Sequence, residues 1–308
     1  TTNANRLTIQ GNYLGTNANG TAAAANAMGL RLVAGGPLQV GGTADSQRNV
    51  ISGNTAHGVY TDLFAASVVI EGNYIGVTAN GNGALANGGH GILSNSSYQG
   101  VRIGSSAAGG GNVISGNTGW GVNLYQTGNP QVFGNRIGTN AAGTAAVANG
   151  SGGLYMIGVT NGAIGGAGVG QRNQISGNAG NGVEDAGYGS GTRVIAGNVI
   201  GLDVSASAAL ANAGSGVVTT QPGTVIGGST AADGNIISGN LGRGVWLGNG
   251  GGSVAVLNNT IGMDATGQQA RPNAVGVMVH SQWGAVGGNI IGSPGQGNLI
   301  AGNSGAGV

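Results

Sequence analysis

Short apolar segments alternate with turns rich in glycine and asparagine along the whole chain. The intervals between ten of these asparagines are 37, 24, 39, 23, 38, 25, 37, 24 and 39 residues, so neighbouring intervals sum to 61 to 63. Each is followed, two positions later, by isoleucine or leucine: Asn12, Asn49, Asn73, Asn112, Asn135, Asn173, Asn198, Asn235, Asn259 and Asn298. Such a period predicts one structural unit that repeats in two versions.

A glycine followed by an aliphatic residue marks the same unit a second time. Ten such pairs span 278 residues in nine intervals, about 31 residues each, and begin at Gly29, Gly58, Gly91, Gly121, Gly153, Gly182, Gly216, Gly244, Gly276 and Gly307. Each unit contains three apolar segments, for example residues 58–62, 68–72 and 73–76. Segments this short, rich in valine and isoleucine and bounded by glycine and asparagine, predict strands rather than helices.

Three strands per unit predict a three-sided coil whose copies stack. Stacking pairs each strand with its counterparts about 4.8 Å above and below, which short strands need for stability. We therefore expect an all-β, three-sided β-solenoid of about ten coils, with residues 1–308 as a single domain roughly 45 to 50 Å long. The aliphatic residues after the coil glycines should form one interior row, namely Val59, Ile92, Val122, Leu154, Val183, Val217, Val245 and Val277.

The two versions of the unit differ in the position of their loops. One has a long loop after the asparagine motif, as in residues 137–150 (IGTNAAGTAAVANG), whereas the other has its insertion before the motif, as in the coil of residues 112–117 (NVISGN). Five similar long loops predict a regular ridge. The ten asparagines should form a ladder, because their side-chain amides can bond the backbone and the amides of neighbouring coils.

The alternation of these two segments with a glycine-aliphatic pair resembles the repeats of the pectin-lyase-like superfamily. The form it resembles is found in very large extracellular bacterial proteins, and the resemblance covers essentially the whole chain. It implies a right-handed parallel β-helix, a secreted or cell-surface location, and a segment of a longer repeat array. It does not specify an activity, because the fold is shared by lyases, hydrolases, adhesins and fibres.

Composition excludes several classes of function. With 71 glycines among 308 residues, helices are disfavoured, since glycine costs about 1 kcal/mol in a helix interior. The net charge is +1 and the nine basic residues are dispersed arginines, so we expect no nucleic-acid partner. No apolar run is long enough for membrane insertion. Cysteine is absent, which removes disulfides and thiolate chemistry.

The ionisable residues suggest no catalytic site. Eight acidic residues fall in different coils, apart from Glu184 and Asp185, which should point to opposite faces of one strand. Paired carboxylates for glycoside hydrolysis are therefore not expected. Asp203 and Asp264 stand at turn positions of the long loops, so we expect turn formation rather than calcium binding. We predict no catalytic residue, metal site or cofactor.

Two histidines precede the coil glycine in successive coils. His57 and His90 should therefore stack, with Trp120 next in line. A ladder of solvated side chains is one interpretation, and a metal or acid-base role is the other.

The residue after each interior aliphatic should point outward. This row contains Tyr60, Leu93, Asn123, Tyr155, Glu184, Val218, Trp246 and Met278. Its large apolar members, together with Tyr125, suggest a protein contact or a platform for sugar rings, although neighbouring loops could also cover them.

The pattern favours a structural extracellular protein, a segment of a bacterial surface stalk, fibre or filament. An adhesin or glycan-binding module that uses Tyr60, Tyr155 and Trp246 is the alternative, and a polysaccharide lyase or hydrolase is a third. No capping coil is visible, so the expected partners are further repeats or other copies of the same chain, with a glycan or cell surface as a second class of partner.

Overall fold

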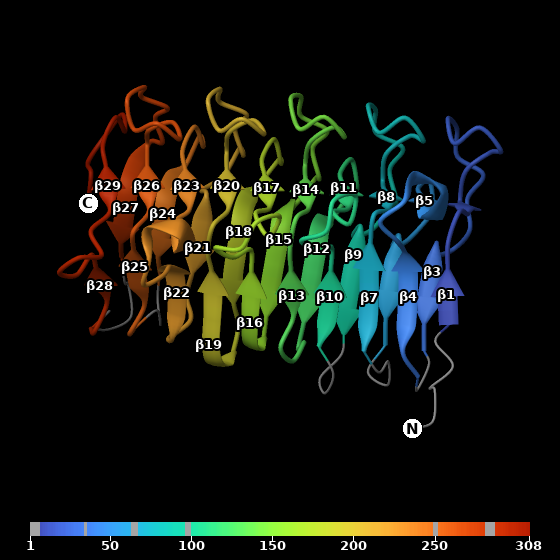
Figure 1. The fold of residues 1–308 in the computed structure, drawn as a ribbon, viewed down its shortest axis with the longest axis horizontal. Coiled ribbons are helices and arrows are strands. Elements are labelled where there is room, and N and C mark those ends of the chain that lie inside the picture. Colours follow the sequence, from blue (N-terminus) through green and yellow to red (C-terminus); the bar gives the residue numbers. More distant parts are fainter. Residues whose placement is uncertain (1–6, 34–35, 63–66, 96–99, 249–251, 281–286) are drawn as a thin grey trace.

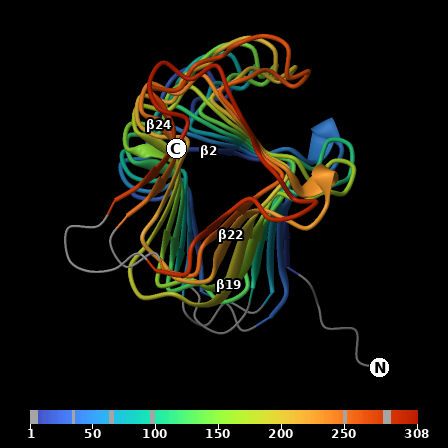
Figure 2. The ribbon, with the colours of Figure 1, turned by 90° about the vertical axis from the view of Figure 1, so that its left-hand side faces the viewer.

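The chain winds into a three-sided parallel β-solenoid, which Figure 2 shows from one end. The computed structural model describes residues 7–33, 36–62, 67–95, 100–248, 252–280 and 287–308. Two sheets of ten strands and one of nine run along the rod, all with parallel pairing (Figure 1). The described residues therefore complete about nine turns rather than ten, because the last glycine-aliphatic pair, at Gly307, forms no strand.

Each coil contributes one strand to each sheet. The first sheet contains β1 (Leu7–Ile9), β4 (Leu38–Gly41), β7 (Val68–Glu71), β10 (Val101–Ile103), β13 (Gln131–Val132), β16 (Thr160–Ile164), β19 (Ser190–Ile195), β22 (Thr224–Gly227), β25 (Ala255–Leu257) and β28 (Ile290–Ile291). The second contains β2 (Tyr13–Leu14), β5 (Val50–Ile51), β8 (Tyr74–Ile75), β11 (Val113–Ile114), β14 (Arg136–Ile137), β17 (Gln174–Ile175), β20 (Val199–Ile200), β23 (Ile236–Ile237), β26 (Thr260–Ile261) and β29 (Leu299–Ile300). The third contains β3 (Leu30–Leu32), β6 (Val59–Thr61), β9 (Ile92–Asn95), β12 (Trp120–Tyr125), β15 (Gly152–Ile157), β18 (Asn181–Ala186), β21 (Val217–Thr219), β24 (Arg243–Leu247) and β27 (Val275–Val279). Two short 3-10 helices lie in the insertion loops, η1 (Asp45–Gln47) and η2 (Ala231–Asp233).

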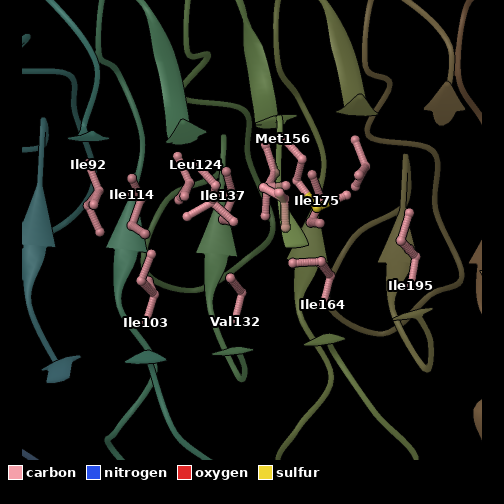
Figure 3. Packing of buried hydrophobic residues seen from close by; sticks show 14 of the residues in the cluster. Ile92, Ile103, Ile114, Leu124, Val132, Ile137, Met156, Ile164, Ile175 and Ile195 are labelled. Atoms are coloured by element: carbon pink, nitrogen blue, oxygen red, sulfur yellow. The ribbon is translucent and has the colours of Figure 1, made fainter. Parts of the chain in front are cut away.

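The interior is filled by aliphatic side chains from all three sheets (Figure 3). In-register pairing places like residues together, so that Val183 lies between Leu154 and Val217. All eight members of the predicted interior row are completely buried, which confirms their assignment. Burial of each such side chain stabilises the fold by roughly 1.5 to 3 kcal/mol.

The predicted asparagine ladder is confirmed. Asn112, for example, donates its backbone N–H and its Nδ2 to Asn135 Oδ1, at 3.0 and 2.9 Å. The same pair of bonds joins each of the ten asparagines to the next, from Asn12 to Asn298. The ladder thus satisfies buried polar groups while it links the coils along the rod.

A second asparagine ladder was not predicted. Each of its members stands three or four residues before a coil glycine and donates its side-chain amide to the next member, in the order Asn26, Asn54, Asn87, Asn117, Asn149, Asn178, Asn212, Asn240, Asn273 and Asn303. The recurrence of an asparagine three or four residues before the glycine was the signal in the sequence that could have revealed it.

The long loops form the predicted ridge, seen along the upper edge of Figure 1. Successive loops are joined by single backbone hydrogen bonds, such as that from Ala141 N to Gly81 O at 2.9 Å. Asp203 Oδ1 accepts the N–H groups of Ser207 and Ala208 within one loop, and Asp264 closes its own loop in the same way. Both aspartates therefore form turns, as predicted.

Candidate functional site

The outward row predicted from the sequence lies on the outer face of the third sheet, and it is the candidate contact surface. Alternation along the strands does turn its row of residues outward, but neighbouring atoms cover most of them in part. Tyr60, Tyr155, Trp246 and Met278 are of intermediate exposure. Val218 is only 5% exposed, so this member of the row does not belong to a solvent face.

Neighbouring side chains occupy one face of several of these rings. Trp120 stacks on Tyr155 with the ring centroids 5.0 Å apart and an interplanar angle of 15°. This stack needs Gly152, because a Cβ there would lie 2.2 Å from Trp120 Cζ3. Burial, and then the charge of Glu184 in the next coil, raise the pKa of Tyr155.

Trp246 is engaged in a comparable way. The guanidinium carbon of Arg243 lies 4.7 Å from the centroid of its ring, an arrangement that suits a cation–π contact. Arg243 Nε also approaches Met278 Sδ at 2.6 Å. Tyr60 has a looser contact with His57, at 6.4 Å between centroids. A sugar ring that stacks on an aromatic side chain needs a free ring face, so this row offers less stacking surface than its composition suggests.

The predicted stack of His57 and His90 is present, with ring centroids 5.1 Å apart. His57 Nδ1 accepts the backbone N–H of His90, and His90 Nδ1 accepts that of Trp120, both at 3.0 Å. Burial lowers the pKa of His57; burial, and then the charge of His57, lower the pKa of His90 to about 4. Both rings are consequently neutral near pH 7 and act as hydrogen-bond acceptors between coils.

The tautomer of His90 fixes the orientation of a neighbouring amide. Since Nδ1 of His90 is an acceptor, the neutral ring has its hydrogen on Nε2. Asn123 Nδ2 is placed 3.1 Å from this Nε2, while Asn123 Oδ1 is buried without a partner. Exchanging the oxygen and nitrogen of the Asn123 amide satisfies both groups, so His90 Nε2–H donates to Asn123 Oδ1.

An open aromatic surface lies at the carboxyl ends of β12, β15 and β18, in the middle of the third sheet. Tyr125 is 40% exposed and Tyr188 is fully exposed, and together with Ile157 they line a groove of about 310 Å³. No ring contact of either tyrosine is found among the described residues. Tyr125 was among the predicted surface residues, but Tyr188 was not.

A buried ion pair inside the solenoid was also not predicted. Arg193 Nε donates to Asp185 Oδ2 at 2.9 Å, and the two side chains are 0% and 1% exposed. Thr224 donates its hydroxyl to the same carboxylate oxygen at 2.7 Å. Burial raises the pKa of Asp185, although the hydrogen bond from Thr224 and the charge of Arg193 oppose this rise.

The surroundings of the pair indicate a structural role. Arg193 Nη1 donates to the carbonyls of Ser190 and Gly191, and Nη2 donates to the carbonyl of Pro222, so the guanidinium ties the start of β19 to the turn before β22. Glu184 points outward while Asp185 points inward, as predicted. Strand alternation from the buried Ile195 back to Arg193 was the signal that could have placed this arginine inside.

Other features bear on what the surface can bind. Among the described residues, no group of three or more histidine, aspartate or glutamate side chains could hold a metal ion. Within the same ranges, no helix has the length and apolarity needed to cross a membrane. No family model, curated protein or solved structure matches the chain.

Proposed function

We propose that this protein is a structural segment of an extracellular rod, such as a bacterial surface stalk, fibre or filament. The observation that supports this proposal most directly is the continuity of the two asparagine ladders. They run beside three parallel sheets from the first described coil to the last, without a break. Backbone and side-chain hydrogen bonds between coils therefore lie along the rod axis, where they resist extension.

The surface chemistry agrees with a mechanical role. Only 6% of the residues are charged, and four ion pairs occur among the described residues. Each coil contacts only its neighbours, so length can be added without changing the core. The resemblance to β-helix repeats of the pectin-lyase-like superfamily supports a secreted location, and we propose further repeats or other copies as the partners.

Electron microscopy and fibre diffraction of the native material test the proposal. Filaments or stalks should be visible, and aligned samples should diffract along the axis at about 4.8 Å, the spacing of stacked strands. Short isolated particles in native material, with no assembly at the cell surface, would contradict a structural role.

A glycan-binding module is the second candidate, and the groove between Tyr125 and Tyr188 favours it. Unlike Tyr155 and Trp246, these two tyrosines have no stacking partner among the described residues, so their ring faces are available to a sugar. A glycan array with the wild-type chain and with Tyr125→Ala and Tyr188→Ala variants tests this function. The Tyr155→Ala variant is the matched control, because its ring is already stacked. Binding that depends on Tyr155 but not on Tyr125 or Tyr188 would reject the groove.

A further inference from the structure

A trough on the outer face of the second sheet has the chemistry of an anion site. Its floor contains Arg136 of β14, Gln174 of β17 and Val199 of β20. The insertion loops at 105–111 and 170–172 form one wall, and Val204 of a long loop lies on the other side. The cavity has a volume of about 290 Å³, enough for a tetrahedral anion and an attached sugar ring.

The charge in this trough is not balanced. Arg136 and Arg172 both line it, and no acidic residue does. Arg172 donates Nε to Gly197 O at 3.1 Å, which leaves its two terminal nitrogens without a partner among the described residues. The side chain of Arg136 has no hydrogen bond or ion pair within those same residues.

Unpaired buried atoms are concentrated at the same place. Apart from Asn123 Oδ1, which the exchange of its amide satisfies, seven buried side-chain nitrogen or oxygen atoms of the described residues have no hydrogen-bond partner, and three of them belong to residues that line the trough. They are Ser105 Oγ, Arg136 Nε and Gln174 Oε1. Gln174 is 5% exposed, and its Nε2 is already used by the carbonyls of Gly143 and Leu202. Buried polar atoms in proteins are normally satisfied, so this cluster points to a ligand.

In the first repeat, the arginine equivalent to Arg172 has partners that neutralise it. Arg48 stands 124 residues before Arg172, which corresponds to two full repeats. It pairs with Asp45 at 2.5 Å, and its guanidinium carbon lies 4.3 Å from the centroid of Tyr74.

Both of these partners are absent at Arg172. The residue three positions before it is Val169, which is 97% exposed, and the place of the aromatic ring is taken by Val199. The third repeat thus lacks the acid and the ring that neutralise Arg48, and a second arginine, Arg136, stands on the adjacent coil.

We propose that this trough binds a tetrahedral oxyanion, the phosphate or sulfate group of a free ion or of a sugar ester. Arginine is suited to this ligand because its planar fork donates two parallel hydrogen bonds to oxyanion oxygens. Ser105 supplies a hydroxyl donor at the wall. Gln174 Oε1 supplies an acceptor for a sugar hydroxyl. This site does not depend on the structural role proposed above, since a rod can bind an anion whether or not it forms filaments.

Calorimetric titration of the whole chain with inorganic phosphate and, separately, inorganic sulfate at low ionic strength tests the proposal. Saturable binding with a Kd of about 1 mM or tighter is expected for at least one of them. Arg136→Gln and Arg172→Gln should each weaken binding about tenfold, the effect of losing one charge-assisted contact. Arg48→Gln is the matched control and should bind as the wild type does.

Further arms separate the sources of the anion and guard against misfolding. Tighter binding of glucose 6-phosphate than of phosphate would assign a sugar ester, and equal binding would assign a free ion. Circular dichroism shows whether each variant folds. If an arginine variant does not fold, Ser105→Ala is a smaller change that tests the same site, and it should also weaken binding. The absence of saturable binding, equal affinity for acetate, or an equal loss in the Arg48→Gln variant would overturn the site.

Discussion

Removal of one central asparagine should destabilise the solenoid strongly, and Asn135→Ala is the most informative change. The side chain of Asn135 is 1% exposed and makes five hydrogen bonds. Its Oδ1 accepts the N–H and Nδ2 of Asn112. Its Nδ2 donates to Ile103 O, Phe133 O and Asn173 Oδ1, at 2.8, 2.9 and 3.0 Å.

The expected loss in the free energy of unfolding depends on which hydrogen bonds the partners of Asn135 retain in the variant. Asn112 Nδ2 retains Ile70 O, Ile103 O retains Phe133 N, and Asn173 Oδ1 retains Asn135 N. The backbone N–H of Asn112 retains nothing, and a buried unpaired donor costs about 1 to 3 kcal/mol. With a net contribution of roughly 0.5 to 1.5 kcal/mol in total for the other bonds that are weakened, the free energy of unfolding should fall by about 1.5 to 4.5 kcal/mol.

Denaturant titration followed by circular dichroism measures this loss, and native-state hydrogen exchange locates it. Amides of the coils on either side of Asn135 should lose protection first, because each coil contacts only its neighbours. Asn12→Ala at the exposed end of the ladder should cost less than about 1 kcal/mol, and Asn82→Ala on an exposed loop less than about 0.5 kcal/mol. If Asn135→Ala cost no more than Asn12→Ala, the ladder would not be a source of stability.

Three further predictions concern the interior and the histidines. Val183→Asp, at a completely buried position, should lower the free energy of unfolding by more than about 4 kcal/mol, whereas Glu184→Val on the outward side should not. An unchanged melting temperature for Val183→Asp would place this row outside the core. Arg193→Ala should cost about 3 to 5 kcal/mol because it leaves Asp185 buried without its partner, but Asp185→Leu combined with Arg193→Met should be close to neutral by thermal denaturation. The pKa of His90 in the folded chain, about 4, lies below its value of about 6.5 in the unfolded chain. As the pH falls through this window, the unfolded chain therefore binds the proton first, and the free energy of unfolding should fall by roughly 1 kcal/mol after allowance for solvent screening. His90→Asn should keep the accepted hydrogen bond and reduce this pH dependence, and an undiminished dependence would assign the effect to another group.

Periodicity predicts the repeated features of this fold well. The interior row, the three strands of each coil, the first asparagine ladder and the turn role of Asp203 all follow from spacing, because every coil places equivalent residues in equivalent surroundings. The second ladder has the same kind of signal, an asparagine three or four residues before each coil glycine. What spacing alone does not give is the degree of coverage on the outer face, which made Val218 buried and left Tyr188 exposed.

The features that sequence reasoning missed share a physical reason. Arg193 and Asp185 come from different sides of one coil, and their pairing depends on two departures from the aliphatic pattern that meet inside the same coil. Arg136 and Arg172 come from adjacent coils and face one trough because β14 pairs in register with β17, which places Arg136 beside Gln174, two residues after Arg172. Neither pair can be predicted from the periodic spacing of residues, because that spacing describes only what the coils have in common.

This distinction also indicates where function should be sought in the chain. A position that repeats ten times is explained by stacking, because the same side chain satisfies the same neighbours in every coil. A polar side chain that breaks the pattern must either be satisfied by a second exception, as Asp185 satisfies Arg193, or remain unsatisfied, as Arg136 does among the described residues. In the first case the two exceptions compensate each other inside the coil. In the second, the part of the chain that the structure describes offers no group that neutralises the arginine, and a bound anion is the simplest agent that supplies one.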